Sequence, residues 1–504
     1  MELTNTASKV VKSTFWIYLR VVFTSLLNLG VIAILSRQLE PEEFGLVALA
    51  GVLIQFLTFL SSQGINEYII YDPVEYKRDE RINGAFWLDI FFGFLTLLIS
   101  IALIPIFTRF YSYEKLALIT FLMALKFPFD AISRVPDALF KKELDFKPIE
   151  IRDFAIQLCV AIGGIVMALN DFGVWSLVIP SVLASPIRAI VIFKLSTWRP
   201  KLNLGISYWK EIFNYSKNII GSTLTSFIIS QGDTLLIGKL LGPTLLGIYN
   251  IAWRSSNLVS RSLMQVSNKL TLPTLAKSSG NKIKLAISFK KILRIIAIAS
   301  FPPLIGLIVI ADVFIIVLYG DKWLGTIIPL RILLIYAMRF SVSSPIGAVF
   351  KAIGKPQINL KIGLIVVPFY LMGIYIGSDY GIIGVALGVT IVRTLSGFLS
   401  FYLVSKALNE SYLSISKPLL QPFLLSICLA IILILVRFFL NYIGLNKPIF
   451  VLIISISMGV LTSWLLLRNI FRSLSLEVVS YLSHILPNKV SLIIFKVLNQ
   501  KYKC

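Results

Sequence analysis

Long apolar runs, each about the length of one membrane crossing, alternate with short polar stretches along the whole chain. The pattern predicts about 14 transmembrane helices and hence an all-α polytopic membrane protein. The predicted spans lie at roughly residues 14–36, 45–65, 85–107, 115–133, 154–169, 173–193, 214–238, 244–266, 292–318, 326–347, 358–376, 381–404, 418–438 and 448–467. Polar residues interrupt two of these runs: Lys126 and Pro128 in the fourth, and Ser230-Gln231-Gly232-Asp233 in the seventh.

Composition supports an integral membrane protein over the full length of the chain. Hydrophobic residues make up 57% of the 504 positions and charged residues only 14%, whereas a soluble domain carries about 25% charge. The net charge of +23 would indicate nucleic acid in a soluble protein. Here most lysines and arginines fall in alternate connections between the predicted spans, as the positive-inside rule requires. The asymmetry predicts that both termini are cytoplasmic and that nucleic acid is not a partner.

Several chemistries are poorly supported by the residues present. The cysteines Cys159, Cys428 and Cys504 form no CxxC pair, and His484 is the only histidine. A disulfide framework, a metal site and most histidine-based catalysis are therefore not expected. No ATP-binding motif is evident, so we expect a protein that is not an enzyme and that holds no cofactor. Residues 470–504 are predicted to form an amphipathic cytoplasmic tail on the membrane.

The chain contains an internal repeat. LSRQLEPEEFGLVALA (residues 35–50) aligns with IGKLLGPTLLGIYNIA (residues 237–252), so that proline and glycine recur at matching loop positions. Two weaker repeats follow, at Lys147-Pro148 with Lys355-Pro356 and at Asp171-Phe172-Gly173 with Asp379-Tyr380-Gly381. An even number of predicted spans separates the halves, which predicts two parallel six-helix bundles around a central cavity, with alternating access to a midplane site. The predicted domains are residues 1–205 and 206–410, two extra helices at 411–469, and the tail at 470–504.

Ionisable side chains within predicted spans are costly and mark functional positions by default. Cations outnumber acids at depth, so a cavity that they line would favour an anion, and the fork of arginine matches phosphate oxygens. The candidates for binding a diphosphate are Arg254, Arg339, Lys126, Arg20 and Arg393. Each could instead belong to a structural ion pair, and Arg20 lies close enough to the inner end of its span to reach water.

Three further polar residues are candidates for a gate or for binding a coupling ion: Asp233, Gln231 and Asp130. The coupling ion, if there is one, could be Na⁺ or H⁺. For Asp233, a packing contact with Lys239 or Arg254 is the competing interpretation. Together with Asp89, these acids also keep open the alternative of a drug/cation antiporter, which needs an acid-lined cavity. Pairing of the acids with the cations would argue against that alternative.

The segment QGDTLLIGKLLGPTLLGIYNIAWRSSNLVSRSL resembles the polysaccharide-exporter branch of the multidrug/oligosaccharidyl-lipid/polysaccharide superfamily, which contains the Wzx-type flippases. The matching pattern is Asp-x-x-x-Ile-Gly-Lys/Arg-x-x-Gly-x-x-x-x-Gly-x-Tyr, satisfied from Asp233 to Tyr249. The resemblance implies movement of undecaprenyl-diphosphate-linked oligosaccharide across the bacterial cytoplasmic membrane for O-antigen, capsule or exopolysaccharide synthesis. It also implies membrane lipids, a polysaccharide polymerase and glycosyltransferases as partners. Related lipid II flippases use arginines on spans 1 and 8, which correspond by span to Arg20 and Arg254.

A membrane glycosyltransferase or polymerase is a further alternative. Such an enzyme needs a sizeable outer loop and catalytic acids, whereas the predicted outer connections are short. The sequence does not name the sugar that is carried.

Overall fold

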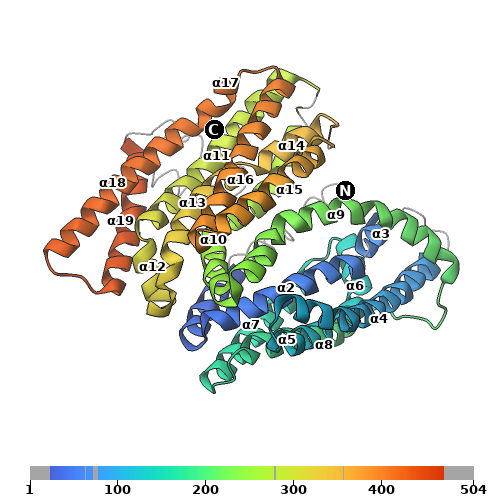
Figure 1. The fold of residues 1–504 in the computed structure, drawn as a ribbon. Coiled ribbons are helices and arrows are strands. Elements are labelled where there is room, and N and C mark those ends of the chain that lie inside the picture. The colour runs from blue at the N-terminus through green and yellow to red at the C-terminus, as the bar shows by residue number, and fades with distance from the viewer. Residues whose placement is uncertain are drawn as a thin grey trace. The chain divides into compact units, whose positions relative to one another are not determined.

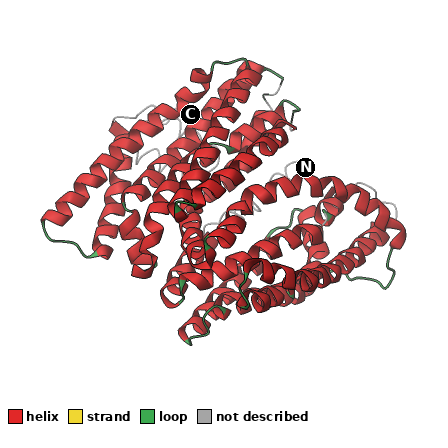
Figure 2. Cartoon of the chain, viewed as in Figure 1, coloured by secondary structure: helices red, strands yellow, loops and turns green. Residues whose placement is uncertain are grey.

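The computed structural model describes residues 23–25, 27–62, 64–71, 78–276, 278, 280–355 and 357–469, and within these ranges the chain forms helices and no strand (Figure 2). Eleven helices of the described part are long and apolar enough to cross a membrane. The predicted all-helical membrane architecture is confirmed, whereas the total of about 14 spans stays a prediction. Packing divides the chain into two compact units, Met1–Asn250 and Ile251–Cys504.

The first unit is built mainly from pairs of neighbouring helices. Within it, α6 packs against both α4 and α8, α7 packs against α8, and α2 lies between α5 and α9. Its helices, coloured blue to green in Figure 1, are α2 (Pro41–Ser62), α3 (Ile65–Tyr71), α4 (Arg78–Tyr111), α5 (Lys115–Ala124), α6 (Lys126–Lys142), α7 (Lys147–Leu169), α8 (Trp175–Leu195), α9 (Ile206–Leu240) and the start of α10 (Gly242–Ala276).

The second unit holds the rest of α10 and the helices that follow. Here α15 pairs with α16, while α11 packs against α13 and α18 around a core that includes Phe289, Leu293 and Phe350. Its elements (Figure 1) are α11 (Lys282–Val309), α12 (Ala311–Leu318), η1 (Asp321–Thr326), α13 (Ile327–Ser341), α14 (Ser344–Ala352), α15 (Gln357–Ser378), α16 (Gly381–Leu408), α17 (Tyr412–Ser416), η2 (Lys417–Leu419), α18 (Leu420–Tyr442) and α19 (Pro448–Asn469).

The two polar interruptions seen in the sequence have different structural results. The fourth predicted span is split at Leu125 into α5 and α6, and Pro128 lies in the first turn of α6, where its missing N–H is not needed. The second unit has a similar split between α13 and α14, followed by Pro345. The stretch from Ser230 to Asp233, by contrast, leaves α9 continuous from Ile206 to Leu240.

The repeated segments mark equivalent connections in the two halves. The first pair of repeated segments, residues 35–50 and 237–252, contains the turn before α2 and the turn at Leu241 before α10. The last pair gives the turn between α7 and α8 and the turn between α15 and α16, with the positive φ angles of Gly173 and Gly381. The domain boundaries predicted from the repeat, at 205/206 and 410/411, remain predictions, and the predicted tail at 470–504 lies outside the described residues.

Candidate functional site

The first helical turns of α2 and α10, which carry the repeated Pro and Gly, cross in the first unit. A Cβ built on Gly45 would overlap the carbonyl group of Pro243, and a Cβ built on Gly247 would overlap the carbonyl group of Pro41. Equivalent residues of the two repeats therefore make the same close backbone contact twice. Only glycine allows helices to approach so closely, which explains in physical terms why both repeats place glycine four residues after proline.

The polar residues of α9 are paired beside this crossing. The hydroxyl of Tyr249 donates a hydrogen bond to Oδ2 of Asp233 at 3.0 Å, and Asp233 is 2% exposed. Gln231 donates from Nε2 to Oε1 of Gln55 on α2. Asp233 and Tyr249 are the first and last residues of the motif from Asp233 to Tyr249, so a buried hydrogen bond joins the two ends of this motif. These satisfied side chains allow α9 to continue through a polar stretch.

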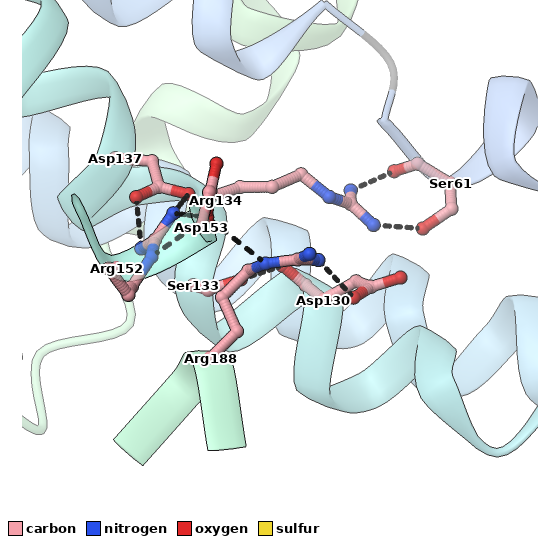
Figure 3. Close-up of polar contacts among 8 residues, drawn as sticks. All are labelled: Ser61, Asp130, Ser133, Arg134, Asp137, Arg152, Asp153 and Arg188. Atoms are coloured by element: carbon pink, nitrogen blue, oxygen red, sulfur yellow. Dashed lines mark hydrogen bonds and ion pairs between the residues drawn. The ribbon is translucent and has the colours of Figure 1, made fainter. Parts of the chain in front are cut away.

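A second group of charges lies between α4, α6, α7 and α8. Arg134 on α6 is 2.5 Å from Asp89, a fully buried residue of α4, and also donates to the carbonyl and hydroxyl oxygens of Ser61 (Figure 3). The other oxygen of Asp89 is buried and accepts no hydrogen bond from the described residues. Asp89, one of the acids that kept a drug/cation antiporter open, is therefore held by a cation from a neighbouring helix.

The same group extends to α7 and α8. Arg152 is 2.6 Å from Asp137 and 2.8 Å from Asp153, and Figure 3 shows both carboxylates turned toward its guanidinium. Arg188 lies more loosely, 3.7 Å from both Asp130 and Asp153. We call Asp89, Asp130, Asp137, Asp153, Arg134, Arg152 and Arg188 the charge network. Acids and cations nearly balance in it, so it has no strong preference for a further anion.

Two candidates from the sequence, Lys126 and Asp130, meet at this network. Lys126 is mostly buried, and its charged neighbours are Asp130, one turn away on α6, and Arg188. The arginines of the network were not among the predicted site residues, because the distribution of charge along the sequence groups them with the cytoplasmic connections. The signal that could have found them is the spacing of Asp130, Arg134 and Asp137, which puts these residues on one face of α6.

A different arrangement surrounds two candidates in the second unit, Arg339 on α13 and Arg393 on α16. The Arg339 guanidinium lies directly on Gly397, where a Cβ would overlap it, and its buried Nε finds no acceptor among the described residues. Arg393 lies within electrostatic range of Arg339 and stands over the ring of Tyr370 at 4.4 Å and that of Tyr336 at 5.4 Å. The aromatic rings stabilise the guanidinium of Arg393, and an anion between the two arginines would offset the repulsion of their like charges.

Tyr336 links this pair to α10. Its ring stacks on Trp253 with centroids 5.4 Å apart and planes 13° apart. The next residue along α10 is the candidate Arg254, which is exposed and acts electrostatically on the hydroxyl of Tyr319. The structure therefore brings Arg339 and Arg393 together in the second unit, with Arg254 next to the tryptophan that stacks on Tyr336, whereas Lys126 belongs to the first unit. Arg20 lies outside the described residues.

The comparisons with known proteins identify the family of the chain. A family model described as "Polysaccharide biosynthesis protein" matches residues 34–328, more than half of the chain. The chain is 25% identical over 484 residues to an "Uncharacterized membrane protein in cps region" of Klebsiella pneumoniae, covering 93% of the chain and 99% of that protein. It is 25% identical over 431 residues to "Lipopolysaccharide biosynthesis protein WzxC" of Escherichia coli (strain K12), covering 83% and 86%.

The fold also has a solved counterpart. The structure of "Lipid II flippase MurJ, inward closed conformation" matches with a TM-score of 0.73 at 14% identity, over 90% of the chain and 98% of that protein. At this identity the likeness concerns the fold, and it is consistent with the superfamily indicated by the motif from Asp233 to Tyr249. The extent of the family match settles membership: the chain belongs to the polysaccharide biosynthesis protein family.

Proposed function

We propose that the protein is a flippase, a transporter and not an enzyme, that moves undecaprenyl-diphosphate-linked oligosaccharide repeat units across the bacterial cytoplasmic membrane. The observation that carries the proposal is the setting of Arg339, a half-buried residue whose buried Nε has no acceptor and which lies beside Arg393 and forms no ion pair with the described residues. A buried charge without a partner is costly to retain. A diphosphate would compensate it, because arginine and phosphate oxygens form strong charge-assisted hydrogen bonds.

In this proposal Arg339, Arg393 and Arg254 bind the diphosphate, and the rings of Tyr336 and Tyr370 hold the guanidinium of Arg393 in place. Arg20 and Lys126 remain candidates for a second contact in the inward-open state. The prenyl chain stays in lipid while rocking of the two bundles exposes the sugars on the other side. The product serves O-antigen, capsule or exopolysaccharide synthesis, with glycosyltransferases supplying the substrate and a polymerase consuming it.

We further propose that both termini face the cytoplasm, in agreement with the distribution of lysine and arginine. The energy source is proposed to be exchange of Na⁺ or H⁺, with Asp233, Gln231 and Asp130 as the residues that respond to the ion. The drug/cation antiporter is less well supported, because the acids that it would need are engaged. Asp89 pairs with Arg134, Asp130 lies near Arg188, and Asp233 accepts from Tyr249.

The first prediction tests the arginine pair directly. Arg339→Ala and Arg393→Ala should each lower the flipping rate by about tenfold to a hundredfold, because a hydrogen bond to a charged group contributes about 1.5–3 kcal/mol. The measurement is the transfer of a lipid-linked repeat unit in proteoliposomes, together with the amount of unflipped precursor in a strain that lacks the gene.

The chain offers a matched control on the same helix. Arg331 lies two turns before Arg339 on α13, but it donates to the carbonyl of Ile308 and reaches Asp312 at 3.4 Å. Arg331→Ala should therefore flip substrate at nearly the wild-type rate. Wild-type flipping by Arg339→Ala and Arg393→Ala, at normal protein levels, would show that the pair does not bind the diphosphate.

A further inference from the structure

A basic cavity lies apart from the arginine pair, at the end of the second unit where α11 begins. Its volume is about 440 Å³, and α11 and the segment from α17 to η2 form its walls. Its polar lining consists of Lys290, Lys291, Arg294, Ser414 and Lys417. Lys290, Lys291 and Arg294 lie three, four and seven positions after Ile287, which also lines the cavity, so these residues of α11 share one face of that helix.

Four cationic side chains line this basic cavity: Lys290, Lys291, Arg294 and Lys417. Lys290 is 2.8 Å from Oε1 of Glu410 and donates to the hydroxyl of Ser414 at 2.8 Å. The hydrogen bond from Lys290 holds the pKa of Glu410 below its ordinary value, so this carboxylate is ionised at neutral pH and offsets one cation. Lys291, Arg294 and Lys417 line the same cavity, and the described residues of its lining include no carboxylate.

The position of the basic cavity is as informative as its charge. It lies on the second to fourth turns of α11 and on η2, which leads directly into α18. Both helices belong to segments long and apolar enough to span a membrane. The cavity is therefore near the beginning of two candidate spans, and exposed Ile287 and buried Pro418 add apolar wall. Basic pockets at the ends of membrane helices are suited to anionic headgroups.

We propose that this cavity binds the phosphate of a membrane-lipid headgroup, with Lys291, Arg294 and Lys417 as its ligands. Lys290 is a positioning residue, because Glu410 and Ser414 hold its ammonium group at the rim. Two lipids offer this chemistry: an anionic phospholipid such as phosphatidylglycerol, and a prenyl diphosphate. The inference goes beyond the proposed transport activity and does not depend on it, since the Arg339–Arg393 pair lies on other helices.

The test measures lipid binding by the full-length protein. The purified protein is titrated in detergent with phosphatidylglycerol, phosphatidylcholine or undecaprenyl diphosphate. Native mass spectrometry then measures how much of each lipid stays bound after the detergent is removed. The double variant Lys291→Gln/Lys417→Gln should lose about tenfold or more in affinity for a phosphate-bearing anionic lipid, because each cation near the membrane surface contributes on the order of a fivefold effect. Binding of zwitterionic phosphatidylcholine should not change.

Lys282→Gln/Lys284→Gln is the matched control. It removes the same charge from the same end of α11, but neither residue lines the basic cavity. If Lys291→Gln/Lys417→Gln loses affinity for phosphatidylglycerol alone, the cavity is a phospholipid site. If it loses affinity for undecaprenyl diphosphate alone, the cavity is a site for the substrate headgroup. Either result supports the proposal. An equal loss in both double variants, or no loss in either, overturns it, since simple surface charge would then explain the binding.

A variant that is expected to strengthen lipid binding tests whether misfolding explains the losses. Glu410→Gln removes the carboxylate that offsets Lys290 and should tighten the binding of the anionic lipid by about twofold to fivefold. Weaker binding in Glu410→Gln, at an unchanged melting temperature, would count against the proposal as strongly as a failure of the double variant.

Discussion

At the scale of single residues, Asp233 shows how one side chain can serve either structure or transport. It is 2% exposed and accepts the hydroxyl of Tyr249. Tyr249→Phe removes that donor and should lower the free energy of unfolding by about 1–3 kcal/mol, because a buried carboxylate loses one of its hydrogen bonds. Asp233→Asn keeps an acceptor in place and should cost less. Thermal melting of the purified protein measures both values.

Transport separates the two roles of Asp233. If Asp233 responds to the coupling ion, Asp233→Asn should abolish the stimulation of flipping by an ion gradient while Tyr249→Phe retains it. If an ion gradient stimulates flipping by Asp233→Asn as much as flipping by the wild type, Asp233 serves only as a packing contact. Sequence patterning identified the acid but not its partner, because the hydrogen bond from Tyr249 depends on how α10 folds back beside α9.

At the scale of the elements, the sequence predicted helices well and their interior contacts poorly. Apolar runs placed the described spans, and Pro128 marked the break between α5 and α6 correctly. The polar stretch at Gln231 suggested an interrupted run, yet α9 is continuous. The reason is that Gln231 bonds to Gln55, a residue far away in the sequence, which no local pattern reveals. Likewise, loop charge statistics hid Arg152, which is 4% exposed on α7.

The charge network supplies the prediction at this scale. Arg152 connects α7 to Asp137 on α6 through a buried pair, so Arg152→Gln should destabilise the protein by about 3–5 kcal/mol. Arg188 lies 3.7 Å from its acids and is about a third exposed, so Arg188→Gln should cost less than about 1 kcal/mol. Chemical unfolding in detergent measures both. Equal losses would mean that the network acts as one cooperative cluster and not as graded pairs.

At the scale of the whole molecule, the internal repeat is the property that sequence and structure describe together. The repeat predicted matching turns, and the structure adds that the glycines of those turns pack against the partner repeat's proline. Spacing alone could not give this contact, because it depends on the path of the chain between the repeats. The contact lies inside the first unit, so it must loosen and reform in each cycle only if transport moves the start of α10 against α2.

The glycine crossing can therefore be tested as a conformational element. Gly45→Ala and Gly247→Ala each place a methyl group against a backbone carbonyl, which cannot be relieved by moving a side chain. Each should raise hydrogen exchange in residues 41–50 and 243–252 and lower the flipping rate. Gly51→Ala is the control on α2, because a Cβ there meets nothing within 4 Å. The repeats make equivalent contacts, so the two substitutions should have effects of similar size. Gly247→Ala could instead change hydrogen exchange and flipping strongly while Gly45→Ala changes neither. The close approach would then matter for α10 alone, and the two repeats would not contribute equally to the contact.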